Sequence, residues 1–210
     1  MGGSMSGNAS FDRFAGWLSV LAGIGGLGYA IAFVVLKDAG LSALFLMLGP
    51  LFAIGGLVAV FERVRGIDAG LALVALVVAA FGSLASSSHG AFDLANVLHP
   101  QVSTVLNPTS SAPDLPNAVD PRGYASFALN GLALILIGWL ARRTSELPGW
   151  VGPLAMALGV VLVVTWLGRL IVLDATSLLV LGPALVAGVL SPAFFLLLGA
   201  WLLGWRRSAG

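Results

Sequence analysis

The feature that most constrains the fold is a set of six long apolar runs that contain no Asp, Glu, Lys, Arg or His. Each run is close to or longer than the roughly 18 to 20 residues that a helix needs to cross a bilayer. None of the runs alternates apolar and polar residues as the strands of a membrane barrel do. The sequence therefore predicts an all-α, polytopic bundle of six transmembrane helices. The runs cover residues 14–36, 39–61, 69–88, 123–141, 147–168 and 175–205.

The composition agrees with a chain that lies mostly in lipid. Hydrophobic residues make up 59% and charged residues 9%, whereas soluble domains carry about 25% charged residues. The chain has no cysteine, which excludes disulfides, thiol catalysis and thiolate metal sites. We expect residues 1–210 to form one integral membrane domain, with the lipid bilayer, other membrane proteins or a second copy of the chain as partners, and not nucleic acid.

The basic residues predict the orientation, because loops on the cytoplasmic side carry an excess of Lys and Arg. If the N-terminus and the even-numbered loops share one side, that side holds seven of the ten basic residues. We therefore expect both termini in the cytoplasm and the protein in the plasma membrane. The seven are Arg13, Arg63, Arg65, Arg142, Arg143, Arg206 and Arg207, and the other three are Lys37, Arg122 and Arg169.

One connection is much longer than the others. It follows the third run, whose helix we expect to continue from residue 88 to about residue 99. The outer loop over residues 100–122 contains five of the ten prolines, so it is predicted to be irregular and extended. Long loops in compact proteins are usually functional or disordered.

Polar residues gather where the third run ends, in the stretch SSSHGAFDLANVLHP at residues 86–100. On a continuing helix, His89, Asp93 and Asn96 stand at i, i+4 and i+7, within a stripe about 60° wide. We call these three residues the polar stripe. His99 is rotated by about 80° from His89. The polar stripe is predicted to face a crevice at the outer face of the bundle.

Arg169 is expected at the same level, because it lies at the outer end of the fifth run. Charged residues within membrane spans tend to face the bundle interior or a water-filled cavity. The residue either pairs with Asp93 or Asp174, which the sequence does not distinguish, or extends its side chain to the lipid headgroups.

The two histidines allow three interpretations. The His89-x-x-x-Asp93 spacing is similar to one element of the membrane hydrolases that include alkaline ceramidases, with His99 as a third possible metal ligand. Those enzymes use further histidines, and this chain has only two. Haem ligation by His89 and His99 requires a break between two diverging side chains. The third reading is that His89 and Asp93 anchor a loop by hydrogen bonds. No catalytic residue and no cofactor is assigned.

Two glycine-containing patterns have simpler readings. The stretch GIGGLG at residues 23–28 matches the dinucleotide fingerprint in form only, because it lies inside an apolar helix without a preceding strand; it predicts close helix packing. Residues 49–60 and 152–163 are identical at six of twelve positions. This match pairs the second run with the fifth, as two inverted three-helix halves would.

Three stretches together, SSSHGAFDLANVLHP, LPNAVDPRGYASFALNGLALILIGWLARR and LPGWVGPLAMALGVVLVV, resemble a family of small bacterial membrane proteins with about six spans and no assigned function. The resemblance covers roughly residues 14–205. It implies a six-helix protein of the bacterial inner membrane, and it supplies no reaction.

These observations lead to three functional hypotheses. The first is a non-enzymatic membrane protein that binds or transports a small lipophilic molecule at His89, Asp93, Asn96 and Arg169. The second is an accessory or assembly subunit of a larger membrane complex, for which glycine-rich helix faces suffice. The third is a metal-dependent membrane hydrolase.

Overall fold

The structure is a computed structural model that describes residues 9–99, 125–172 and 177–205. Within these ranges it contains helices and no strand. Two segments are π-helical, and each adjoins an α-helix. The elements are α1 (Ala9–Ala30), η1 (Ile31–Leu36), α2 (Ala39–Val64), α3 (Ala69–Leu98), η2 (Ala125–Leu129), α6 (Asn130–Ala141), α7 (Val151–Ile171) and α8 (Leu178–Leu202).

Five helices are long and apolar enough to cross a membrane, and the stretch Ser126–Ala141 forms a sixth, shorter apolar helix. The protein is therefore a helical bundle with the character of a multi-pass membrane protein. The short helix corresponds to the predicted run 123–141. At about 1.5 Å per residue it spans roughly 24 Å, less than the hydrocarbon core of about 30 Å.

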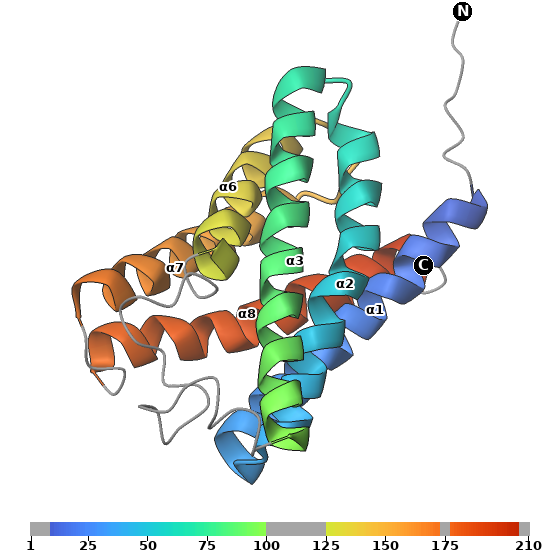
Figure 1. Ribbon diagram of the computed structural model, residues 1–210. Helices are drawn as coiled ribbons and strands as arrows, with labels where there is room; N and C mark the ends of the chain where they lie inside the picture. The colour runs from blue at the N-terminus through green and yellow to red at the C-terminus, as the bar shows by residue number, and fades with distance from the viewer. Residues whose placement is uncertain (1–8, 100–124, 173–176, 206–210) are drawn as a thin grey trace, which may run out of the picture.

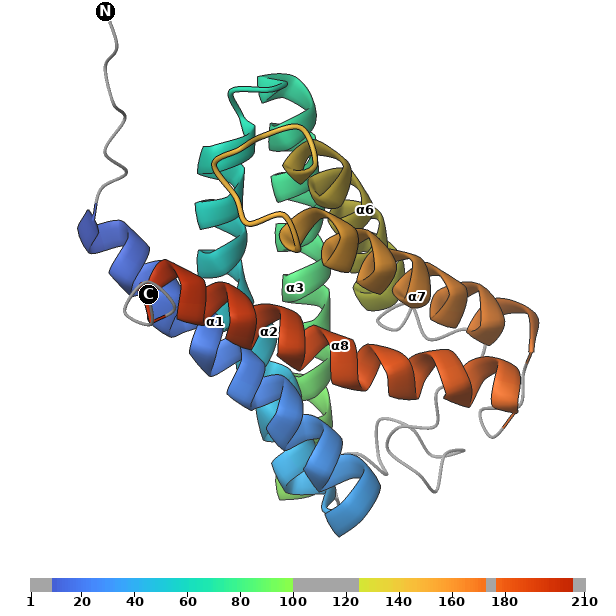
Figure 2. The same cartoon turned by 180° about the vertical axis from the view of Figure 1, so that it is seen from behind.

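The helices close into a ring in the order of the chain. Each packs against its neighbour in sequence, and α8 returns to pack against α1. Figure 1 shows α2 and α3 side by side, with α8 crossing behind them and α7 beside α6, and Figure 2 shows α1 and α8 together from behind. Short connections between long helices favour this antiparallel arrangement of neighbours.

Both ends of the described chain lie at one end of the bundle. The Trp17 and Trp205 rings contact each other edge to face, with centroids 5.7 Å apart. Arg63, near the end of α2, binds Asp12 of α1 through an ion pair of 2.8 Å. We call this the arginine-rich end; it also holds the connections 65–68 and 142–150. The opposite end holds η1, η2 and the last turns of α3.

Several helix boundaries differ from the uncharged runs. The first helix begins at Ala9 instead of residue 14, because Asp12 is held by Arg63 and the helix does not need to end at the first charge. The helix α7 begins at Val151, four residues after the run does, since a turn precedes it in which the Val151 N–H donates to the Pro148 carbonyl. The helix α3 runs over Ala69–Leu98 and so includes the polar stripe.

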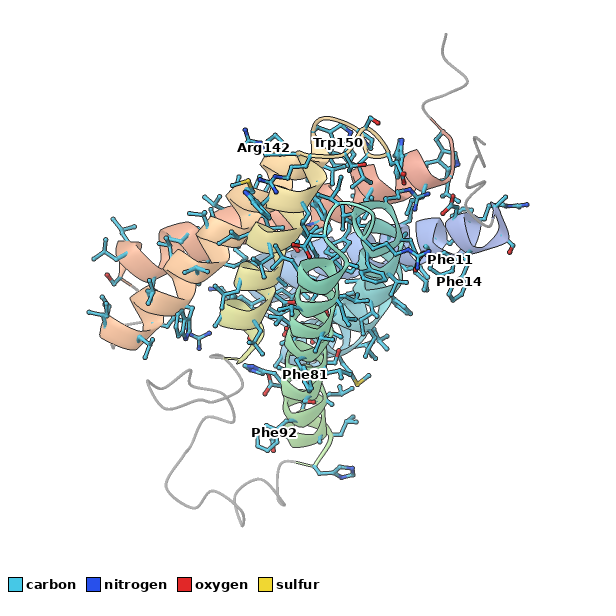
Figure 3. The ribbon with its side chains drawn as sticks, turned by 90° about the horizontal axis from the view of Figure 1, so that it is seen from above. Phe11, Phe14, Phe81, Phe92, Arg142 and Trp150 are labelled. Atoms are coloured by element: carbon cyan, nitrogen blue, oxygen red, sulfur yellow. The ribbon has the colours of Figure 1, made fainter. Side chains whose placement is uncertain are left out.

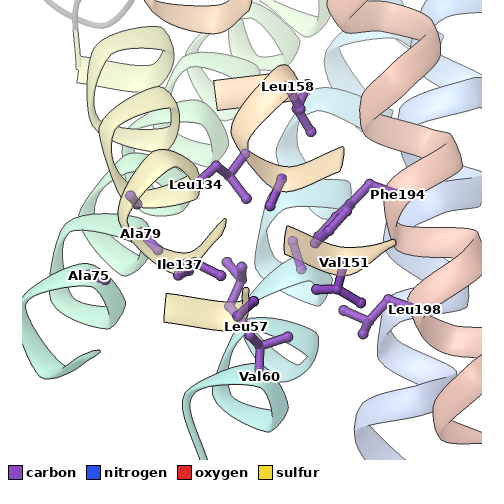
Figure 4. Close-up of a cluster of buried hydrophobic side chains, with 14 of the residues drawn as sticks. Leu57, Val60, Ala75, Ala79, Leu134, Ile137, Val151, Leu158, Phe194 and Leu198 are labelled. Carbon is purple, nitrogen blue, oxygen red and sulfur yellow. The ribbon is translucent and has the colours of Figure 1, made fainter. Parts of the chain in front are cut away.

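The core is made of Leu, Val, Ile, Ala and Phe side chains from α1, α2, α3, α6, α7 and α8. Figure 4 shows Leu57 and Val60 of α2 converging with Ile137 of α6 and Phe194 of α8. Glycines bring backbones together outside this cluster. A Cβ atom on Gly25 would lie 2.9 Å from the Cα of Gly49, so part of the GIGGLG stretch serves the packing of α1 on α2.

Candidate functional site

The polar stripe begins with a contact between an imidazole and a carboxylate inside α3. His89 Nε2 lies 3.2 Å from Asp93 Oδ2, and the two side chains are 10% and 16% exposed. Helical geometry brings residues four apart onto one face, so the sequence spacing is enough to make this contact. A pair that is largely withdrawn from solvent interacts more strongly than one at the surface.

Asn96 continues the polar stripe one turn farther along α3 and is also buried. Its Nδ2 has no hydrogen-bond partner among the residues that the structure describes. A buried donor left without a partner costs about 1 to 3 kcal/mol. Asn96 is therefore a position where an added hydrogen-bond acceptor would stabilise the protein.

The length of α3 places the polar stripe near a membrane boundary. The helix has 30 residues, about ten more than a span requires. Because it begins at Ala69, next to the charged connection 65–68, about 20 residues and 30 Å of helix precede His89. If the hydrocarbon core begins at Ala69, the polar stripe lies at the level where it ends.

A second polar cluster lies one turn closer to the bundle centre, between α3 and the η2–α6 helix. Asn130 donates through Nδ2 to the Ser126 carbonyl oxygen (2.8 Å) and to Ser86 Oγ (3.4 Å). A Cβ atom on Gly82 would lie 2.7 Å from Asn130 Oδ1, so the glycine makes room for the amide. The Asn130 side chain thus fixes the register of η2 against α3.

Sequence reasoning missed Asn130 and Ser126. The available signal was an asparagine inside an otherwise apolar run, since polar residues in transmembrane helices commonly hydrogen-bond across helices. Asn130 lies at the level of Gly82, and η2 begins only five residues earlier, at Ala125.

The η2 segment is π-helical. Single turns of π-helix inside α-helices are rare and occur frequently at functional sites. Here the π turn lies beside the end of α3 that carries His89, and it packs against both α3 and α7.

Arg169 lies on the other side of η2. Its guanidinium carbon is 5.4 Å from the ring centroid of Phe127, a cation–π distance. No ion pair joins it to a carboxylate in the described ranges. Of its two expected partners, Asp93 pairs with His89, and Asp174 lies outside the described residues. Because α3 and α7 pack on η2 rather than extensively on each other, Arg169 belongs to the same region but not to the same cluster.

His99 does not join His89. It is exposed at the C-terminus of α3, where its backbone N–H donates to the Ala95 carbonyl. Over the described ranges, no three His, Asp or Glu side chains are grouped so that they could hold a metal ion. The described residues thus bring His89 and Asp93 together. Within the described ranges, a metal site there would have no third ligand, and a haem site would have no second histidine opposite His89.

Comparison of the chain with protein-family models, with curated proteins and with solved structures finds no match. The structure supports one part of the sequence resemblance, namely several apolar helices long enough to cross a membrane.

Among the described residues, the chemistry available at this end of the bundle is hydrogen bonding. An acid–base pair, a buried amide donor and a serine–asparagine cluster lie along one side of α3. They are flanked by exposed apolar side chains such as Phe92 and Val97, which face lipid in a membrane protein. Such an arrangement suits a molecule with an apolar body and a small polar group.

Proposed function

We propose that the protein is a non-enzymatic, multi-pass membrane protein that binds or transports a small lipophilic molecule at the polar stripe. The observation that carries the proposal is the largely buried His89–Asp93 pair, with the buried Asn96 donor one turn away on the same face. A ligand carbonyl or hydroxyl oxygen would accept from Asn96 Nδ2 and remove the cost of its burial. The apolar body of the ligand would lie against Phe92 and the surrounding lipid.

Arg169 is the more distant candidate in this proposal. Its stacking on Phe127 leaves it at the same end of the bundle as the polar stripe, on the far side of η2. A ligand long enough to pass η2 would be required to contact both. The variant Arg169→Gln tests this part separately.

The test measures what the purified protein retains. Solvent extracts of the protein, prepared in mild detergent, are analysed by mass spectrometry for lipophilic molecules other than bulk phospholipid. We expect a retained molecule in the unaltered protein and its loss, by tenfold or more, in Asp93→Asn and Asn96→Ala. Ser88→Ala is the matched control, because Ser88 is an exposed polar residue of the same helix.

Equal retention by the control, by Asp93→Asn and by Asn96→Ala would remove the polar stripe from the binding site. Loss in all three, with a lowered melting temperature, would indicate a damaged fold instead of a ligand contact. Circular dichroism of each variant separates these two results.

We further propose that the protein lies in a bacterial plasma membrane with both termini in the cytoplasm. The support is the charge distribution, with seven of ten basic residues on the side of the termini, and the sequence resemblance described above. Since the chain has no cysteine, Lys37→Cys and Ser145→Cys provide single labelling sites at the two ends. An impermeant maleimide should label Lys37→Cys in intact cells and Ser145→Cys only after permeabilisation; the reverse pattern contradicts the orientation.

A further inference from the structure

The arginine-rich end contains more cations than its carboxylates neutralise. Asp12 pairs with Arg63, and Glu62 pairs with Arg65. Asp68 accepts a hydrogen bond from the Leu71 backbone N–H at the start of α3. Among the described residues, three arginines at this end form no ion pair, and they are Arg13, Arg142 and Arg143.

Arg142 and Arg143 are consecutive residues at the end of α6, and both side chains are exposed. Glu146 is the carboxylate nearest to them in sequence. Its backbone N–H donates to Thr144 Oγ1, and no ion pair joins its carboxylate to either arginine. The pair therefore presents two positive charges toward the surroundings. The C-terminus of α6 attracts these cations through the helix dipole.

Both arginine side chains are held by packing. The guanidinium carbon of Arg143 lies 3.7 Å from the ring centroid of Trp139, one turn earlier on α6. The stem of Arg142 occupies space beside Gly152 of α7, where a Cβ atom would lie 2.5 Å from Arg142 Cγ. Figure 3 shows Arg142 and Trp150 at the connection between α6 and α7. Stacked and packed arginines lose less side-chain entropy when they bind an anion.

The position of these arginines beside an interfacial tryptophan indicates which anion they would bind. Tryptophans are enriched where a membrane protein meets the headgroups, and Trp139 is 39% exposed beside Arg143. At this level the anion in highest supply is the phosphate of a lipid. Guanidinium groups bind phosphate through paired N–H donors.

We propose that the end of α6 is a binding site for a phosphate group, formed by Arg142 and Arg143 with Trp139 and Gly152 positioning them, and that an anionic phospholipid headgroup supplies the phosphate. The site lies at the end of the bundle away from the polar stripe. It is independent of the function proposed above.

The test uses protein purified in a neutral mild detergent and three probes. These are dioctanoyl phosphatidylglycerol, dioctanoyl phosphatidylcholine and sodium phosphate. Native mass spectrometry counts bound lipid, and the shift in melting temperature gives the apparent affinity. We expect phosphatidylglycerol to bind at least tenfold more tightly than phosphatidylcholine.

The variants separate a site from diffuse charge. Arg143→Gln should weaken phosphatidylglycerol binding about fivefold, because it removes one guanidinium–phosphate contact from the site. Arg13→Gln is the matched control, because it removes an exposed, unpaired arginine from the same end, and it should change the affinity less than twofold. Arg143→Lys keeps the charge and loses the planar stacking, so it should fall between them.

Each result decides one point. Sodium phosphate that matches phosphatidylglycerol would keep the phosphate site and make a soluble phosphate its source. Equal affinity for the two lipids, or equal losses in Arg13→Gln and Arg143→Gln, would overturn the site in favour of general attraction to the membrane. Gly152→Ala, which displaces the stem of Arg142, should also weaken binding, and an unchanged affinity would remove Arg142 from the site.

Discussion

The two ends of the bundle use their charged residues differently. At the arginine-rich end, Arg63 joins three helices: its guanidinium binds Asp12 of α1, donates to the Ala59 carbonyl of α2 and lies 5.0 Å from the Trp201 ring of α8. At the opposite end, the described His89–Asp93 contact joins two residues of the same helix, α3. Arg63 thus links helices at the arginine-rich end, whereas the described His89–Asp93 contact lies within α3.

The opposite end is held instead by close backbone contact. A side chain at Gly90 of α3 would overlap the Met47 amide nitrogen of α2, and Gly82 accommodates Asn130 of α6. Van der Waals contact between small residues is what drives helix association in lipid. This comparison predicts four effects on stability, measured by unfolding in mixed detergent micelles.

The largest expected effect is at Gly90. Gly90→Ala places a Cβ atom against the backbone of α2, and overpacking of this kind costs about 3 kcal/mol when the backbone must move. Gly188→Ala makes the same change at a helical position with nothing within 4 Å and should not destabilise the protein. Equal stability of the two variants would show that α2 and α3 do not approach closely at this end.

The second effect is at Arg63, whose side chain is 16% exposed. Arg63→Ala removes a charged hydrogen bond to Asp12, a bond to the Ala59 carbonyl and a ring contact, so we expect a loss of about 2 kcal/mol. The control is Arg65→Ala, because the Arg65–Glu62 pair is 44% and 41% exposed and should contribute less than about 0.5 kcal/mol. Similar losses would mean that the arginine-rich end is not held by this ion pair.

The third effect is at Asn130. Asn130→Ala removes the 3.4 Å interhelical contact to Ser86 and frees the space beside Gly82 that the amide fills, together with the 2.8 Å bond to the Ser126 carbonyl of its own helix; interhelical polar contacts in membranes contribute about 1 kcal/mol. Ser86→Ala removes only the 3.4 Å contact and should cost less than half as much. A neutral Asn130→Ala would contradict the role of this amide in fixing η2 against α3.

The smallest effect is a gain at Lys37, which has φ of 53° in the left-handed region at the end of η1. An exposed residue with a side chain is strained there, and glycine is not. Lys37→Gly should stabilise the protein by about 0.5 kcal/mol, whereas Lys37→Ala should not, since alanine keeps the Cβ atom. A gain of the same size in both variants would show that the backbone conformation is not the cause.

Part of the candidate site follows from the sequence alone. The spacing of His89 and Asp93 places them one helical turn apart, so any continuous helix brings them into contact. The burial of Asn96 could not be predicted from the sequence. The spacing places Asn96 on the same helix face as His89 and Asp93, but only the surrounding packing buries it. The partner of Arg169 did not follow either: the sequence offered Asp93 and Asp174, and the structure places Arg169 over Phe127.

The sequence by itself determined the helices, since each long uncharged run satisfies its backbone hydrogen bonds internally and must be helical in lipid. It also determined the His89–Asp93 contact within α3. The tertiary structure decided how the helices close into a ring, how Asn130 fits against Gly82, and how Arg63 meets Asp12 across 51 residues of sequence. The physical reason is that contacts within a helix depend on local spacing, whereas contacts between helices depend on which small residues let two backbones approach, and the hydropathy pattern does not encode that choice.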